Sequence, residues 1–112
     1  MLIASWNVNS IRTRLNQVKD FLQRNKIDIL CLQETKVSNK DFPSKPFEDL
    51  GYIVKFSGQK AYNGVAIISK FEFQDLKVDF VGELKEKELG KDFIEQKRII
   101  SALINNVRII NV

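Results

Sequence analysis

The 112 residues form one domain or part of one, and 44% of them are hydrophobic, which is enough to build a core and excludes a wholly disordered chain. The net charge of +4, from 18 basic and 14 acidic side chains, is compatible with a polyanionic partner but is common without one. Histidine is absent, which excludes serine–histidine and cysteine–histidine nucleophiles and histidine-ligated zinc, so any catalysis would use carboxylates, amides, hydroxyls, lysines or a metal held by oxygen ligands.

The N-terminal third of the chain has the pattern of a strand, a helix and a second strand. LIASWNV is an apolar run without helical spacing, which predicts a buried strand. The next apolar residues recur at helical intervals and predict a helix from about Ser10 to Arg24, capped by Asn9 or Ser10 and ending near Asn25. IDILCLQ predicts the second strand. A crossover of this length joins parallel strands, so we expect a βαβ unit.

The middle of the chain predicts a loop followed by a hairpin. Residues 36–47 are rich in polar residues and contain both prolines, which predicts a surface loop. YIVKFS and VAIIS predict two strands. The stretch QKAYNG between them predicts a turn, with Asn63-Gly64 as the hairpin signal.

The C-terminal third predicts further strands around a charged segment. FEFQDLKVDF alternates in part and predicts a strand. Residues 82–98 are mostly charged, which predicts a solvated excursion. RIISALI and VRIINV predict a hairpin across Asn105-Asn106. The chain ends at Val112 inside an apolar strand, which predicts a truncated domain because free termini are usually polar.

Several features predict a protein of the reducing cytoplasm with no membrane partner. No apolar stretch approaches the ~18 residues that a membrane span needs. The N-terminus MLIASWNVNS does not have the pattern of a secretory signal. The single cysteine, Cys31, excludes an internal disulfide and lies in an apolar run, which predicts a buried thiol.

The predicted βαβ unit makes Asn7 and Glu34 a candidate metal site. Parallel strands end at the same edge of a sheet, and Asn7 closes the first strand while Glu34 follows the second, so we expect the two side chains to lie side by side. An amide oxygen and a carboxylate suit Mg²⁺. Spacing alone leaves the simpler interpretation open, in which Glu34 is merely solvated and Asn7 is a helix cap.

Four segments carry a resemblance to a known family. SWNVNSIRTR, DILCLQETK, GQKAYNGVAIISK and EQKRIISALI occur in the order found in the exonuclease III and apurinic/apyrimidinic endonuclease family. This family belongs to the endonuclease/exonuclease/phosphatase superfamily with the DNase I-like fold, and its members are more than twice as long. The resemblance implies an α+β fold, an α/β sandwich of four layers, of which about one sheet and its first helix are expected here.

The resemblance implies a role for ten residues of this chain. Asn7 and Glu34 match the metal-site pair for Mg²⁺, which Mn²⁺ can replace, and Asn9 matches a supporting polar residue. The residues that match DNA-contacting positions are Arg12, Lys36, Lys60, Tyr62, Asn63, Gly64 and Arg98. Ser10 stands where many members have glycine, and serine is an acceptable helix cap there.

A purely structural explanation exists for several of these residues. Arg12 has the properties of an ordinary basic residue on a wet helix face, and Lys36 and Lys60 those of plain loop lysines. Tyr62 has room to pack on its own hairpin, and the turn needs Asn63-Gly64 whatever the function. Trp6 is expected in the core.

The family's remaining catalytic residues have no counterpart here. In the family, the strand that matches RIINV continues into a Tyr-x-Pro-x-Gly segment, followed by Asp and Asn residues and an Asp-His pair that handle the attacking water. We therefore expect residues 1–112 to be the N-terminal part of a single domain, with little or no nuclease activity alone. The resemblance implies that the full enzyme hydrolyses double-stranded DNA at abasic sites and 3′ ends in base-excision repair, and we expect it to be a cytoplasmic monomer.

Two other functions remain open. One is a different phosphodiesterase or phosphatase of the same superfamily, such as a phosphoinositide phosphatase, a sphingomyelinase or a poly(A) nuclease. The other is a non-catalytic remnant, a half-domain that keeps some phosphate contacts and binds DNA without magnesium or not at all.

Overall fold

The computed structural model describes residues 1–78 and 97–112, and its first three elements are the predicted βαβ unit. Strand β1 (Ile3–Asn7) and strand β2 (Ile29–Gln33) are parallel, in register from Ile3 opposite Ile29 to Asn7 opposite Gln33. Helix α1 (Ile11–Asn25) connects them. The Ser10 hydroxyl caps α1 by accepting from the Thr13 amide at 3.2 Å. The predicted boundaries are therefore confirmed to within a residue or two.

Two antiparallel strands complete the first sheet. Strands β3 (Ile53–Ser57) and β4 (Val65–Ser69) form the predicted hairpin. Strand β4 also pairs with β2, which gives the order β1-β2-β4-β3. Strand β4 is buried along its whole length, as its continuous apolar sequence predicts.

The prediction of a surface loop over residues 36–47 was wrong in part. A short 3₁₀ helix (Asn39–Asp41) and helix α2 (Lys45–Glu48) lie in this region, and Phe47 is fully buried. Pro46 suggested a break, but it lies in the first turn of α2, where a missing amide hydrogen costs nothing. Phe42 stacks on Phe56 with ring centroids 4.3 Å apart, so aromatic burial holds this connection against the sheet.

The second sheet is more extensive than predicted. Strands β5 (Phe73–Lys77), β6 (Ile100–Ile104) and β7 (Val107–Asn111) form an antiparallel sheet in the order β5-β6-β7. The predicted turn at Asn105-Asn106 is confirmed, with positive φ at both residues. The chain therefore contains strands of two sheets, and the expectation of about one sheet was too low. Of the predicted charged excursion, only Lys97 and Arg98 lie within the described residues.

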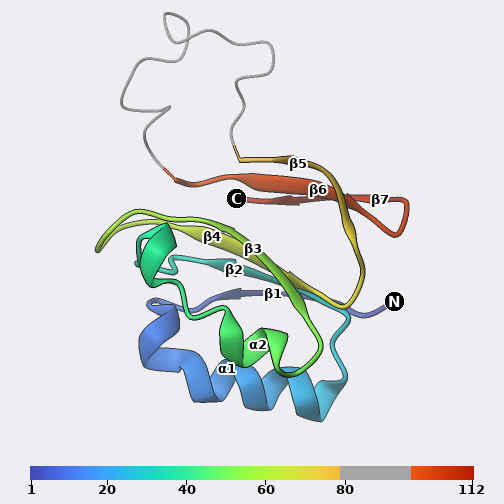
Figure 1. The fold of residues 1–112 in the computed structure, drawn as a ribbon, viewed down its shortest axis with the longest axis horizontal. Coiled ribbons are helices and arrows are strands. Elements are labelled where there is room, and N and C mark those ends of the chain that lie inside the picture. Colours follow the sequence, from blue (N-terminus) through green and yellow to red (C-terminus); the bar gives the residue numbers. More distant parts are fainter. Residues whose placement is uncertain (79–96) are drawn as a thin grey trace, which may run out of the picture.

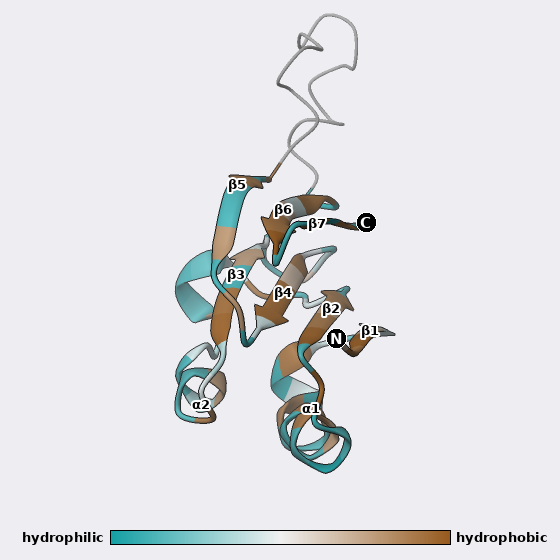
Figure 2. Ribbon diagram, turned by 90° about the vertical axis from the view of Figure 1, so that its right-hand side faces the viewer, coloured by the Kyte–Doolittle hydropathy of each residue, from teal (hydrophilic) through white to brown (hydrophobic). Residues whose placement is uncertain are grey.

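The described residues form three layers: helices, the first sheet and the second sheet (Figure 1). Strand β2 contributes to both interfaces, because Leu30 and Leu32 pack toward α1 while Ile29 and Cys31 pack toward the second sheet. Figure 2 shows hydrophobic residues along β2, β3 and β4 of the first sheet and hydrophilic residues on the outer surface of α1. The predicted α/β sandwich is confirmed, with three of its four layers in the described part of the chain.

The prediction that LIASWNV is a buried strand was wrong in part, because β1 lies at the edge of the first sheet and its residues are alternately exposed and partly buried. Cys31 is buried, and burial raises the pKa of its thiol to about 11. Trp6 is partly buried and meets Phe21 of α1 edge to face at 5.5 Å, so it borders the core. Within the described residues, no helix combines the length and apolar character needed to cross a bilayer.

Candidate metal centre

Backbone hydrogen bonds bring four separate loops together at one edge of the first sheet. The turn after β2 accepts from the turn after β1, with Ser10 N to Glu34 O at 2.9 Å. The same turn donates to the loop before β4, with Lys36 N to Asn63 O at 2.9 Å. Gly64 N then donates to Lys97 O at 2.8 Å. Residues far apart in the sequence are therefore held beside the carboxyl ends of β1 and β2.

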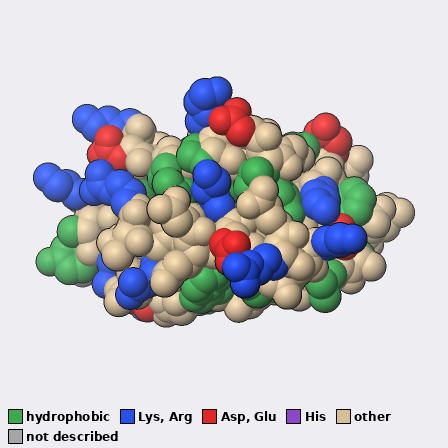
Figure 3. All heavy atoms as spheres, turned by 90° about the horizontal axis from the view of Figure 1, so that it is seen from below, with side chains coloured by type: hydrophobic (Ala, Val, Ile, Leu, Met, Phe, Trp, Pro, Cys, Tyr) green, Lys and Arg blue, Asp and Glu red, His purple; other side chains and the backbone are tan. Residues whose placement is uncertain are grey.

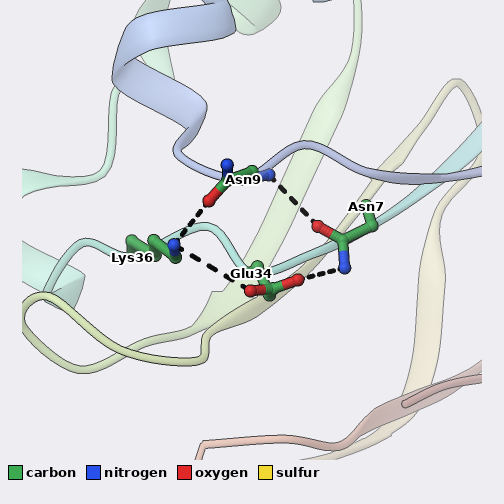
Figure 4. Close-up of polar contacts among 4 residues, drawn as sticks. All are labelled: Asn7, Asn9, Glu34 and Lys36. Atoms are coloured by element: carbon green, nitrogen blue, oxygen red, sulfur yellow. Dashed lines mark hydrogen bonds and ion pairs between the residues drawn. The ribbon is translucent and has the colours of Figure 1, made fainter.

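Asn7, Glu34, Lys36 and Asn9 form a closed ring of polar contacts at this edge (Figure 4). The Asn7 side-chain amide donates to Glu34 Oε2, and Asn7 Oδ1 accepts from the Asn9 backbone amide at 3.2 Å. Lys36 Nζ donates to Asn9 Oδ1 and lies 3.9 Å from Glu34 Oε1. The predicted juxtaposition of Asn7 and Glu34 is therefore present, and the ring fixes the orientation of the only carboxylate in it.

The backbone that carries this ring is strained. Asn9, Ser10, Glu34, Lys36 and Asn63 all have positive φ, between 46° and 91°. Asparagine adopts this conformation readily, but it costs residues such as Glu34 and Lys36 about 1–2 kcal/mol and persists where surrounding contacts enforce it. Ser10, at φ 91°, keeps the helix cap but adopts a conformation that favours glycine, so serine at this position carries a conformational cost.

A cleft of about 380 Å³ opens beside the ring. Both halves of the chain contribute to it, and its lining residues are Asn7, Gln33, Glu34, Asn63, Gly64, Val65, Lys97, Arg98 and Val112. Five of the ten predicted site residues therefore lie together, since Asn7, Glu34, Asn63, Gly64 and Arg98 all line this cleft. Lys97 and Arg98 bring two positive charges to the cleft that the Glu34 carboxylate also lines.

The other predicted residues lie outside the lining of this cleft. Lys36 and Asn9 belong to the polar ring, while Arg12 is exposed in the first turn of α1. Lys60 and Tyr62 are exposed in the loop between β3 and β4, and Tyr62 is 69% exposed. On the helix side of the molecule, basic side chains are spread across the surface rather than gathered in one patch (Figure 3). Overall charge alone therefore does not mark a binding surface there.

Gln33, Gln59 and Lys97 were not predicted from the sequence. Gln33 follows the apolar run of β2 and was taken as its end, although alternation places it on the same face as Ile29 and Cys31. Gln59 Oε1 accepts from the Lys97 amide at 2.9 Å and from Asn63 Nδ2 at 3.2 Å. Strand alternation could have identified Gln33, whereas the contact between Gln59 and Lys97 spans 38 residues and has no local signal.

The donor set at this edge fits a hard divalent cation. Among the described residues, no three His, Cys, Asp or Glu side chains form a cluster, which fits neither structural zinc nor an all-carboxylate calcium cage. Mg²⁺ differs, because it needs only one or two protein carboxylates and fills its other positions with water and substrate phosphate. Glu34 is half-exposed at the cleft and meets this requirement.

Gly64 packs directly against the turn that carries Glu34. A Cβ atom on Gly64 would lie 2.1 Å from Thr35 Oγ1, and Thr35 is fully buried. Gly51 is a matched control. Its φ of 92° is nearly the same as the 93° of Gly64, but a Cβ atom on Gly51 would meet nothing within 4 Å. We expect Gly64→Ala to lower the free energy of unfolding by roughly 1–3 kcal/mol more than Gly51→Ala, because only Gly64→Ala adds a clash.

Urea unfolding of the two alanine variants measures this difference. Alanine at a positive φ destabilises both variants to a similar extent. The difference between their unfolding midpoints therefore isolates the contact with Thr35. Equal destabilisation of the two variants would contradict the close packing of the loop on the turn.

Comparison with known proteins identifies relatives that match most of the chain. Residues 4–102 match the Endonuclease/Exonuclease/phosphatase family. The chain is 34% identical over 102 residues to exodeoxyribonuclease III of Haemophilus influenzae, covering 91% of this chain and 35% of that protein. It superposes on an AP endonuclease from Archaeoglobus fulgidus with a TM-score of 0.84 and 45% identity, covering 98% of this chain and 40% of the other. It also superposes on a 3′ phosphatase from Neisseria, bound to a product DNA hairpin, with a TM-score of 0.87 and 42% identity. That match covers 98% of this chain and 40% of the other.

Proposed function

Because this chain belongs to the endonuclease/exonuclease/phosphatase family, we propose that it forms the metal-binding part of a magnesium-dependent DNA nuclease of base-excision repair. The observation that carries the proposal is the Asn7–Glu34 contact in a cleft that Arg98 also lines. A carboxylate for the cation and a guanidinium for phosphate meet there. The relatives' names, exodeoxyribonuclease III and AP endonuclease, support DNA as the substrate.

In this proposal Glu34 is the protein ligand and Asn7 orients it. The Asn7 amide donates to Glu34 Oε2, so the other carboxylate oxygen remains directed toward Lys36. When bound, Mg²⁺ would supply positive charge that stabilises the phosphate and the leaving oxygen. Asn7 Oδ1 is held by the Asn9 amide, which suits a contact to the cation through water. Mn²⁺ has the same preference for oxygen ligands and is expected to substitute.

The basic and loop residues would position the DNA backbone. Arg98 lies in the cleft, and Arg12 is in the first turn of α1, next to the segment that carries Asn9. Lys36 would exchange its contact with Glu34 for substrate phosphate once a cation is bound. The exposed loop with Lys60, Tyr62, Asn63 and Gly64 would contact the sugar-phosphate backbone. Such contacts fix the position of the duplex without reading its sequence.

The proposed substrate is double-stranded DNA with abasic sites or 3′ ends, and the proposed enzyme is a cytoplasmic monomer. The chain spans 35% of the length of the curated relative and about 40% of the solved ones. It also contains no histidine to serve in the pair that handles the attacking water. We therefore propose that residues 1–112 are the N-terminal part of a single domain, and that the isolated chain cleaves DNA slowly or not at all.

A substrate panel tests the proposal in the complete protein that contains this chain. The panel comprises an abasic-site duplex, a 3′-recessed duplex, poly(A) and a phosphoinositide, each with Mg²⁺ and with EDTA. We expect cleavage of the two DNA substrates with Mg²⁺ only. Preferential hydrolysis of poly(A) or the phosphoinositide would assign another activity of the superfamily, and magnesium-independent DNA binding without cleavage would assign a binding module. Efficient cleavage by the 112-residue chain alone would overturn its proposed inactivity.

A further inference from the structure

Asn111 is a polar residue at a core position of β7. Alternation along β7 directs Ile109 and Asn111 toward the first sheet, while Arg108 and Ile110 are exposed. Ile109 packs in the apolar layer between the sheets, and Asn111 is 2% exposed. Burying an amide costs free energy that an apolar residue at this position would not, and hydrogen bonds must offset that cost.

The Asn111 side chain forms a bridge between the two sheets. Its Nδ2 donates to Leu32 O of β2 and to Ala66 O of β4, both at 2.8 Å. Its Oδ1 accepts from Gln33 Nε2 at 2.7 Å. One side chain of the second sheet therefore holds two adjacent strands of the first sheet through three bonds of ordinary length.

The three bonds end at the residues that support the candidate metal centre. Leu32 and Gln33 immediately precede Glu34, and Ala66 lies two residues after Gly64. Gln33 also donates to Ser5 Oγ of β1 at 3.0 Å and lies opposite Asn7 in the β1–β2 register. The Asn111–Gln33 pair thus contacts all three strands, β1, β2 and β4, whose ends form the cleft.

We propose that Asn111, acting through Gln33 and the Leu32 carbonyl, is a positioning residue for the metal-holding carboxylate Glu34. It anchors the end of β2 to the second sheet. The left-handed turn at Glu34 begins directly after this anchored end. This inference rests on the proposed function, because it assigns Glu34 as the ligand. Groups that orient a metal ligand from behind commonly change metal affinity by 10–100-fold when they are replaced.

A purely structural role for Asn111 would give a different result. Any buried residue of β7 that only stabilises the fold should affect metal binding no more than its neighbours do. Ile109 provides the comparison, because it lies on the same face of the same strand, is 7% exposed and packs among apolar residues. Ile109→Val removes one methylene from that layer and leaves the three Asn111 bonds in place.

The test is a Mn²⁺ titration of the complete protein that contains this chain, with free Mn²⁺ measured by its paramagnetic resonance signal. The proteins compared are the wild type, Glu34→Gln, Asn111→Leu, Gln33→Met and Ile109→Val, each with its thermal midpoint. We expect a roughly 10-fold weaker Mn²⁺ affinity for Asn111→Leu. Gln33→Met should weaken it by a smaller factor, and Ile109→Val should leave it unchanged despite a lower thermal midpoint.

The outcomes separate the inference from the proposed function. If Glu34→Gln binds Mn²⁺ as the wild type does, the metal assignment itself is wrong. If Glu34→Gln loses binding while Asn111→Leu keeps wild-type affinity, the positioning role is wrong. An equal loss of affinity in Asn111→Leu and Ile109→Val also contradicts it. Should Asn111→Leu fail to fold, Gln33→Met decides, because unchanged affinity in that variant overturns the inference.

Discussion

Glu34→Gln should weaken divalent-metal binding by the complete protein by at least about 100-fold, since replacing a group that only supports a metal ligand already costs up to about 100-fold. The substitution keeps the shape of the side chain and its contact with the Asn7 amide but removes the charge. Stabilisation of charge by a bound metal contributes several kcal/mol to phosphodiester cleavage, so the rate on an abasic-site duplex should fall on the order of 1000-fold. Isothermal titration with Mg²⁺ and single-turnover cleavage measure the two effects.

Glu48→Gln is the matched control for this experiment. Glu48 is exposed in α2 and is not among the residues that line the cleft. Its substitution by Gln changes the net charge by the same amount as Glu34→Gln. It should leave both metal affinity and cleavage rate unchanged. A wild-type rate for Glu34→Gln, or an equal loss in both variants, is incompatible with the assigned site.

Removing Arg12 and Arg98 together should lower DNA affinity on the order of 100-fold, because a charge-assisted hydrogen bond contributes about 1.5–3 kcal/mol. Both side chains are exposed; Arg12 lies in the first turn of α1, and Arg98 lines the cleft. If each contacts one phosphate, the slope of log affinity against log salt should also decrease by about 1.8 in the variant Arg12→Gln/Arg98→Gln. Fluorescence anisotropy at several salt concentrations gives both quantities.

The control for general electrostatics removes two basic residues elsewhere. Arg24→Gln/Lys26→Gln makes the same change of charge at the far end of α1, which lies roughly 18 Å from Arg12 at 1.5 Å per helical residue. This variant should keep the wild-type salt slope. If both double variants lose the same affinity and slope, DNA binding reflects net charge rather than specific contacts made by Arg12 and Arg98.

The βαβ unit and its polar edge could be predicted because their signals are local. The helical spacing around Ile11 and Val18 fixes α1, and two apolar runs on either side of it fix β1 and β2. Parallel pairing then places Asn7 beside Glu34 without further information. Recognition of the motifs gave these two residues a chemical role that spacing alone did not.

Long-range packing could not be predicted in the same way. Gln33 and Asn111 are 78 residues apart, so no local signal predicts their hydrogen bond, although strand alternation could have placed Gln33 on the inner face of β2. Pro46 signals a break in a sequence, yet its position in the first turn of α2 depends on the burial of Phe47. Strand β5 is largely exposed, with only Phe73 partly buried. Its sequence therefore alternates only weakly, and the extent of the second sheet could not be predicted from it.

The placement of a cation at the edge of β1 and β2 is tested most directly by anomalous diffraction from crystals of the complete protein grown with Mn²⁺. We predict one Mn²⁺ peak at bonding distance from the Glu34 carboxylate, beside Asn7 and within the cleft that Arg98 lines. A fully occupied Mn²⁺ peak elsewhere in the domain, with Glu34 bound only to Asn7 and Lys36, would contradict it.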